Sequence, residues 1–194
     1  MISLDTFTSL NIPYLRSKIS EIDLRPISYC ILNEMYRGYF CGEVGSEHYK
    51  LLAFLSLHFN DSYIYDIGTH IGGSSIALAH NKKNIVISYD VVDMKEMQNP
   101  PSNIMYHIGD FMRDEEVLSS PLIFIDADHN GKDEISFHEF FLKNNYKGIV
   151  VWDDIHLNPE MKQFWMSVEN PKLDLTSLGH ATGTGMIFYN SESP

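Results

Sequence analysis

The fold of this chain is set by the run Tyr63-Ile64-Tyr65-Asp66-Ile67-Gly68-Thr69-His70-Ile71-Gly72-Gly73-Ser74. In it an apolar strand ends on a carboxylate, a glycine-rich turn follows, and a serine stands at the start of a helix. Three later strand-like runs also end on an aspartate, at Asp90, Asp126 and Asp153. Because the carboxyl ends of parallel strands meet at the same edge of a sheet, the sequence predicts an edge lined with carboxylates.

Strands and helices alternate through the middle of the chain. Strands are predicted near 62–67, 85–90, 103–107, 121–126 and 147–152, and helices near 43–59, 73–81, 112–119, 132–144 and 158–167. This alternation predicts an α/β fold with a doubly wound, Rossmann-like, mostly parallel sheet. The last two strand-like runs, 173–178 and 184–189, have no helix between them. They are therefore expected to form an antiparallel C-terminal hairpin at one edge of a seven-stranded sheet.

The N-terminal part is expected to be a separate feature of a single-domain protein. Residues 1–41 are predicted to be irregular and to act as an N-terminal cap or helical extension, and residues 42–194 form the main domain. Within the N-terminal part, residues 27–40 are apolar and aromatic and predict a short helix. Two interpretations of this segment stay open, an intramolecular cap on the main domain and a contact in a homo-oligomer.

Composition narrows the class of protein. Lys and Arg number 14 and Asp and Glu 26, so the 194 residues carry a formal net charge of −12. Such a charge repels nucleic acid and anionic membranes, and neither is expected as a partner. No apolar run approaches the ~18 residues of a membrane helix, and residues 1–11 lack a secretory signal pattern. Cys30 and Cys41 are expected to be reduced thiols, which predicts a cytoplasmic protein.

The glycine turn is typical of a site for an adenosine-containing cofactor. Gly68 lets the chain turn sharply after the strand, and Gly72 lets a ligand approach the backbone closely. Ser74 opens a helix whose free N–H groups suit a carboxylate or phosphate. His70 stands where the dinucleotide motif Gly-x-Gly-x-x-Gly has its second glycine, which disfavours a nicotinamide cofactor. A plain strand-to-helix turn is the alternative.

Two further groups are expected to complete that site. Asp90 lies about 20 residues after the glycine turn, where an acidic residue accepts hydrogen bonds from ribose hydroxyls. Gly109-Asp110-Phe111 follows the next strand and is expected to bracket an adenine ring, with Asp110 accepting from its amino group. The alternatives are a solvated strand end for Asp90 and a simple turn for residues 109–111.

Carboxylates gather after the next two strands, in the runs Asp126-Ala127-Asp128-His129 and Asp153-Asp154-Ile155-His156. Asp126, Asp153 and Asp154 are expected to lie within a few ångströms of one another. Carboxylates that close repel unless a proton or a cation relieves them, and hard oxygen ligands favour Mg²⁺ or Ca²⁺. The alternative is that these aspartates are helix N-caps.

His129 is the predicted general base, because its near-neutral intrinsic pKa suits the removal of a hydroxyl proton. Asp128 is a rival for that role. His156 and His180 are weaker rivals, since only position singles out His129.

With these motifs the chain resembles the class I S-adenosylmethionine-dependent methyltransferases, in particular their metal-dependent O-methyltransferases. That group includes catechol and caffeoyl-CoA O-methyltransferases and sugar O-methyltransferases of macrolide pathways. The run from Asp66 to Ser75 is similar to the cofactor loop of the group, and Asp126-Ala127-Asp128-His129 and Asp153-Asp154 are similar to its two metal-ligand motifs. The resemblance covers roughly residues 43–189. Gly73 departs from it, because catechol-type enzymes carry an aromatic residue there.

The resemblance implies S-adenosylmethionine as cofactor and Mg²⁺ or another divalent cation held by Asp126, Asp153 and Asp154, with His129 deprotonating the acceptor. The residues it implies for the cofactor are Asp66, Gly68, Thr69, His70, Gly72, Ser74, Asp90, Gly109, Asp110, Phe111 and Asp126. The acceptor expected first is a hydroxyl of a sugar or glycoconjugate, and a catechol-like phenol is second. Two other classes stay open, a cofactor-binding module without turnover and a nicotinamide-dependent oxidoreductase.

Overall fold

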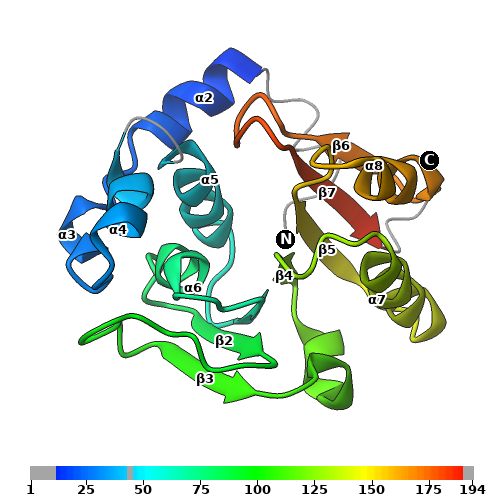
Figure 1. Cartoon of the computed structure of the whole chain (residues 1–194), viewed down its shortest axis with the longest axis horizontal. Coiled ribbons are helices and arrows are strands. Elements are labelled where there is room, and N and C mark those ends of the chain that lie inside the picture. Colours follow the sequence, from blue (N-terminus) through cyan, green and yellow to red (C-terminus); the bar gives the residue numbers. More distant parts are fainter. Residues whose placement is uncertain (1–11, 43–45, 190–194) are drawn as a thin grey trace.

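The chain folds around one seven-stranded sheet, in the order β3-β2-β1-β4-β5-β7-β6, with helices on both faces (Figure 1). The structure, a computed structural model, describes residues 12–42 and 46–189. The strands are β1 (Tyr63–Ile67), β2 (Ile85–Asp90), β3 (Ile104–Ile108), β4 (Leu122–Ile125), β5 (Gly148–Asp153), β6 (Lys172–Asp174) and β7 (Thr184–Tyr189). The helices are α2 (Ile12–Ser20), α3 (Arg25–Ser28), α4 (Glu34–Cys41), α5 (Ser46–Ser56), α6 (Gly73–Leu78), α7 (Lys132–Lys143) and α8 (Pro159–Ser167), with two 3₁₀ turns, η1 (Phe111–Arg113) and η2 (Glu115–Ser119).

Strand pairing confirms the predicted topology. β1 to β5 are parallel to their neighbours, whereas β7 runs antiparallel to β5 and β6 antiparallel to β7. The chain first builds the sheet outward from β1 to β3 and then returns to add β4 on the other side of β1. Such a reversal opens a crevice beyond the carboxyl ends of the strands, which is where ligands bind in sheets of this kind.

The central strands are apolar on both faces because each face is covered by helices. All four residues of β4 and all six of β5 are buried. Side chains alternate between two cores along each strand, so that Ile64 packs with the α5 and α6 face and Tyr65 with the α7 and α8 face. Figure 1 shows α5 and α6 on one side of the sheet and α7 and α8 on the other.

The prediction that residues 1–41 are irregular is wrong for the part that the structure describes. Residues 12–41 contain α2, α3 and α4. In α2, Leu15 and Ile19 lie four residues apart and bury one side of the helix in the core that also holds α5. Residues 1–11 lie outside the described part of the chain.

The apolar segment 27–40 has an inner and an outer side. Cys30, Ile31 and Phe40 are buried in the core of the domain, so the segment does act as an intramolecular cap. Its other side is exposed at Tyr29, Leu32, Met35 and Tyr39. In place of the single short helix expected here, the segment forms α3, a turn and α4, which starts where Asn33 accepts hydrogen bonds from the backbone of Met35 and Tyr36.

The helix predicted for residues 112–119 is replaced by η1 and η2. Asp110 accepts from Met112 N and caps η1, and Asp114 accepts from Glu116 N and caps η2. Because Asp114 has an extended backbone (φ −95°, ψ 103°), no continuous helix can pass through it. The predicted strand 173–178 is also shorter, since β6 ends at Asp174 and Leu178 N turns back to donate to Leu175 O.

No helix within residues 12–42 and 46–189 combines the length and the hydropathy that crossing a membrane requires.

Candidate cofactor and cation site

A cavity of about 670 Å³ opens at the carboxyl ends of the parallel strands, where the strand order reverses. Most residues predicted for the site line it: Gly68, His70, Asp90, Gly109, Asp110, Phe111, Asp126, Asp128 and His129. The remaining predicted residues lie outside this lining: Asp66, Thr69, Gly72, Ser74, Asp153 and Asp154.

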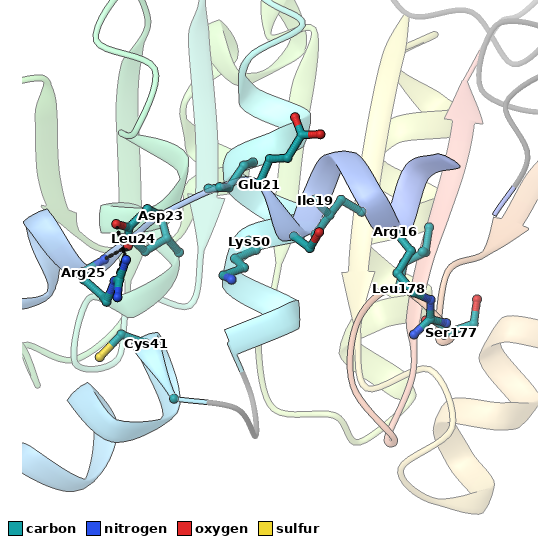
Figure 2. Close-up of a pocket in the computed structure, with 13 residues that line it drawn as sticks. Arg16, Ile19, Glu21, Asp23, Leu24, Arg25, Cys41, Lys50, Ser177 and Leu178 are labelled. Atoms are coloured by element: carbon teal, nitrogen blue, oxygen red, sulfur yellow. Dashed lines mark hydrogen bonds and ion pairs between the residues drawn. The ribbon is translucent and has the colours of Figure 1, made fainter. Parts of the chain in front are cut away.

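A second cavity, of about 620 Å³, lies among α2, α5 and the loop at Ser177 and Leu178 (Figure 2). Its basic side chains are engaged in part, because Arg16 Nη2 donates to Ser177 O at 2.6 Å and Arg25 pairs with Asp23 at 2.8 Å. None of the predicted site residues lines it. The first cavity is therefore the candidate site.

Gly68 joins the ends of β1 and β4. Its φ is +97°, and a Cβ at this position would lie 1.7 Å from the carbonyl oxygen of Asp126. Next to this contact, Asp126 N donates to Ile67 O at 2.8 Å. Only glycine lets the turn after β1 pass this close to the residue that follows β4.

Asp66 lies beneath the turn and does not reach the cavity. Its carboxylate is fully buried and accepts a hydrogen bond from Ser88 Oγ at 2.7 Å. Ser88 Oγ also lies 2.7 Å from Thr69 Oγ1, so the two predicted residues Asp66 and Thr69 are linked below the glycine turn. Burial raises the pKa of Asp66 to about 7. The arrangement braces the turn.

The start of α6 is covered by neighbouring side chains. A Cβ at Gly72 would lie 1.9 Å from Met97 Cε, and one at Gly73 would lie 2.9 Å from Tyr49 Cε1. Ser74 is buried in the same region. The aromatic ring that position 73 lacks is thus supplied from α5 by Tyr49.

The residues predicted for ribose and adenine have structural partners as well as a face on the cavity. Asp90 accepts from His70 N at 2.8 Å and from Val92 N at 3.1 Å. Asp110 caps η1, and the buried Phe111 ring packs against Phe137 with centroids 5.0 Å apart. Since a carboxylate has about four lone-pair sites, these contacts leave Asp90 and Asp110 able to accept from a ligand.

His129 stands between two of the predicted cation ligands. Its Nε2 lies 3.0 Å from Asp126 Oδ1 and 3.5 Å from Asp154 Oδ2. Burial on its own lowers the pKa of an imidazole, but the hydrogen bond with Asp126 and the charges of both aspartates outweigh it and raise the pKa of His129 to about 9. Burial and the nearby Asp153 raise the pKa of Asp126.

Two residues that the sequence analysis missed hold the loop that carries His129. The buried Glu134 accepts from His129 N at 3.0 Å and from Gly131 N at 2.7 Å. Asn158, the N-cap of α8, donates to His129 O at 2.8 Å. A glutamate three residues after the N-cap of a helix is a recognisable capping signal, so the role of Glu134 could have been predicted from the sequence.

Asp153 faces a different pair of histidines. Its Oδ1 lies 2.8 Å from His180 Nε2 and 3.6 Å from His48 Nδ1. Burial on its own raises the pKa of Asp153, but the His48 ring and the hydrogen bond with His180 lower it overall. The sequence analysis rated His180 a weak rival base and did not single out His48, which comes from α5 and carries no local motif.

The cluster formed by Asp126, Asp153, Asp154 and the histidines His48, His129 and His180 fits a divalent cation. Two of its buried polar atoms, His48 Nδ1 and Asp154 Oδ1, have no hydrogen-bond partner within the described residues. Unpaired buried polar atoms are rare in folded proteins, and a bound ion or water molecule can satisfy them. Carboxylate oxygens and imidazole nitrogens are both ligands for divalent metals, and this site offers both.

Comparison with known proteins supports the fold. No family model matches the sequence, and no curated protein matches it. Among solved structures, the chain is similar to the O-methyltransferase TomG from Streptomyces achromogenes, solved in complex with SAM, with a TM-score of 0.54 and 16% identity over 97% of this chain and 99% of that one. It is also similar to the SAH-bound methyltransferase PaMTH1 from Podospora anserina, with a TM-score of 0.54 and 12% identity over 98% of this chain and 99% of that one. These likenesses show that the chain shares the fold of the two methyltransferases.

Proposed function

We propose that this chain is an S-adenosylmethionine-dependent O-methyltransferase that also uses a divalent cation. One observation carries the proposal. The glycine turn, Asp90 and the Asp126–His129 pair border a single cavity at the point where the strand order reverses. The likeness to folds that hold SAM in TomG and SAH in PaMTH1 agrees with this assignment.

Cofactor binding is assigned to the part of the cavity edge that follows strands β1, β2 and β3. The methionine end would lie over residues 68–74, with its carboxylate near Ser74. Asp90 would accept hydrogen bonds from the ribose, and Asp110 and Phe111 would bracket the adenine. The paired contacts of Asp90 with His70 N and Val92 N hold its carboxylate still, which favours binding because little freedom is lost.

The cation is assigned to the carboxylates that the sequence predicted, Asp126, Asp153 and Asp154. When bound, it would lower the pKa of an acceptor hydroxyl. Asp154 Oδ1, which accepts no hydrogen bond from the residues that the structure describes, supports this assignment.

His129 is assigned the role of general base, which removes the hydroxyl proton of the acceptor. Asp128, which lines the same cavity, is the rival for this role. With a pKa of about 9, His129 carries a proton at neutral pH as long as Asp126 and Asp154 are its partners. A cation held by those aspartates would weaken the interactions that raise this pKa. The ring of His129 would then be neutral and able to accept the proton of the acceptor hydroxyl.

The acceptor proposed first is a hydroxyl of a sugar or glycoconjugate. A base with an imidazole side chain beside a cation suits an alcohol whose own pKa is high. A catechol-like phenol is the second candidate, and Tyr49 favours it, because that ring stands against Gly73 where catechol-type enzymes carry an aromatic residue.

The test is transfer of a labelled methyl group from S-adenosylmethionine to a panel of sugars, glycoconjugates and catechols, with Mg²⁺ and with a chelator. We expect transfer to one acceptor class and its loss with the chelator. The Asp126→Ala variant should lose turnover while it binds S-adenosylhomocysteine almost as well as the parent chain. The matched control is Asp93→Ala, at an exposed aspartate outside the cavity. Loss of both turnover and cofactor binding in Asp126→Ala would count against the assigned roles.

A further inference from the structure

We propose that His48, Asp153 and His180 form a binding site for a transition-metal ion of the Zn²⁺ class. The inference refines the cation of the proposed function, because it adds two histidine nitrogens to Asp153, one of the carboxylates assigned to that cation. A catalytic role for this metal rests on the proposed function, whereas the binding of the metal does not.

The three side chains converge from distant parts of the chain. His48 comes from α5, Asp153 ends β5, and His180 lies in the turn that precedes β7. One ligand atom from each lies within 4.8 Å of the other two. Ligand atoms bound tetrahedrally at about 2.0–2.1 Å stand roughly 3.3 Å apart. The observed separations of 2.8 Å and 3.6 Å from Asp153 Oδ1 bracket that value.

An unpaired buried atom points to the ligand independently of this convergence. The side chain of His48 is 7% exposed, and its Nδ1 has no hydrogen-bond partner among residues 12–42 and 46–189. The rings of Tyr49, Phe124 and His180 pack around it, with centroids 5.1, 5.5 and 4.7 Å away. A polar nitrogen enclosed in this way destabilises the fold unless something binds it. The nitrogen lies on the side of Asp153, where a shared cation would satisfy it.

The second histidine is held as a metal ligand is held. His180 Nδ1 is hydrogen-bonded to Thr182 Oγ1, which fixes the ring and turns Nε2 toward Asp153. Metal-binding histidines almost always have their other ring nitrogen engaged in this way.

The donor set selects the class of metal. Imidazole nitrogens suit Zn²⁺ and Fe²⁺, whereas Mg²⁺ favours carboxylates, carbonyls and water. Three protein ligands leave a position open, which is the pattern of catalytic rather than structural zinc sites. Asp154 Oδ1, 3.9 Å from His180 Nδ1, stands at the rim of the site.

The test is metal binding by the full chain after chelator treatment. Calorimetric titration with ZnCl₂ and with MgCl₂ should give one tight Zn²⁺ site and far weaker Mg²⁺ binding, and Co²⁺ should give the visible absorption of a nitrogen-ligated site. His48→Asn and His180→Asn should each weaken Zn²⁺ binding by about 100-fold or more. The control His58→Asn, at an exposed histidine just after α5, should bind Zn²⁺ within about 3-fold of the parent chain.

Three outcomes would overturn the inference. They are Zn²⁺ binding no tighter than that of Mg²⁺, Zn²⁺ binding that survives both histidine substitutions in folded protein, and equal loss in the control His58→Asn. Circular dichroism of each variant reports folding, and if His48→Asn does not fold, the Co²⁺ spectrum of His180→Asn decides. Titration with S-adenosylhomocysteine separates the two proposals. Cofactor binding without a Zn²⁺ site sinks only this inference, and a Zn²⁺ site without cofactor binding or methyl transfer sinks only the proposed function.

Discussion

The carboxyl edge of the sheet has two halves that are built in different ways. At the ends of β2 and β3, backbone N–H groups hold the carboxylates that face the cavity, as His70 N and Val92 N hold Asp90. At β4 and β5, histidine side chains hold them, as His129 holds Asp126 and His180 holds Asp153. The first half is therefore fixed by local chain geometry, and the second by charges that protons and cations can change.

The two halves are therefore suited to different tasks in the proposed enzyme. A cofactor with a constant shape is well served by a rigid turn whose partners are main-chain atoms. Control of an acceptor proton needs groups whose charge responds to what is bound. The two halves meet where Gly68 passes the carbonyl oxygen of Asp126, so one position can test both.

The largest effect is expected for Gly68→Ala. The added Cβ would meet a backbone oxygen at 1.7 Å and needs a φ of +97°, so both halves must move. We expect affinity for S-adenosylhomocysteine to fall about 100-fold or more, with a lower melting temperature, measured by calorimetry and thermal unfolding. In the control Gly38→Ala, within α4, the Cβ meets nothing among the described residues within 4 Å, and the backbone is not in the left-handed region. Equal losses in the two variants would mean that the two halves are not joined at Gly68.

A large but one-sided effect is expected for His129→Asn. Removing a general base lowers kcat by about 10²–10⁴-fold, while the cofactor half should bind S-adenosylhomocysteine unchanged. Steady-state kinetics and calorimetry measure the two quantities. The matched control is His156→Asn, which breaks a similar 2.8 Å pair with Asp174 away from the cavity. If both substitutions slowed turnover alike, the effect would not belong to the base.

The same division explains what the sequence could predict. Strand and helix alternation, the glycine turn and the aspartates at strand ends are local patterns, and they predicted the sheet and the cavity residues of the first half. The N-terminal helices were missed in a stretch that contains Pro13 and Pro26. Pro26 in fact lies in the first turn of α3, where a helix tolerates proline because that N–H has no partner to lose.

The second half was only partly predictable for a related reason. Asp126, His129 and Asp153 follow strands and could be placed by topology. His48 reaches Asp153 only because α5 packs over the strand ends, and a lone histidine in a helix has no spacing that signals this. Asp114 is the opposite case. An aspartate inside a predicted helix is a local signal for an N-cap, so the capping of η2 could have been predicted.

A moderate effect on stability is expected for Glu134→Gln. The buried carboxylate accepts from His129 N and Gly131 N, and an amide can replace only one of these acceptors while it adds buried donors. We expect the free energy of unfolding to fall by about 1–3 kcal/mol in urea titrations. Glu139→Gln, at an exposed position of the same helix, should change it by less than about 0.5 kcal/mol. A neutral result for Glu134→Gln would show that the His129 loop does not depend on this brace.

The smallest effect is expected for pH, and it separates the two halves most directly. The pKa of His129 rises in the folded state from the ordinary 6.5 to about 9, so its contribution to stability is complete below pH 6.5 and is lost as the pH rises through 9. With chelator present, the free energy of unfolding should therefore fall between pH 6.5 and pH 9.5. The loss should be on the order of 1 kcal/mol, since the partly exposed ring is screened. Asp66 has a pKa of about 7, and its ionisation also lowers the free energy of unfolding. Most of that decrease occurs at pH values below this range. The measurement is urea unfolding of the parent chain and of His129→Asn at both ends of the range. A fall that is as steep in His129→Asn as in the parent chain would assign the pH response to other groups, and the contrast between a rigid half and a titrating half would then lose its support.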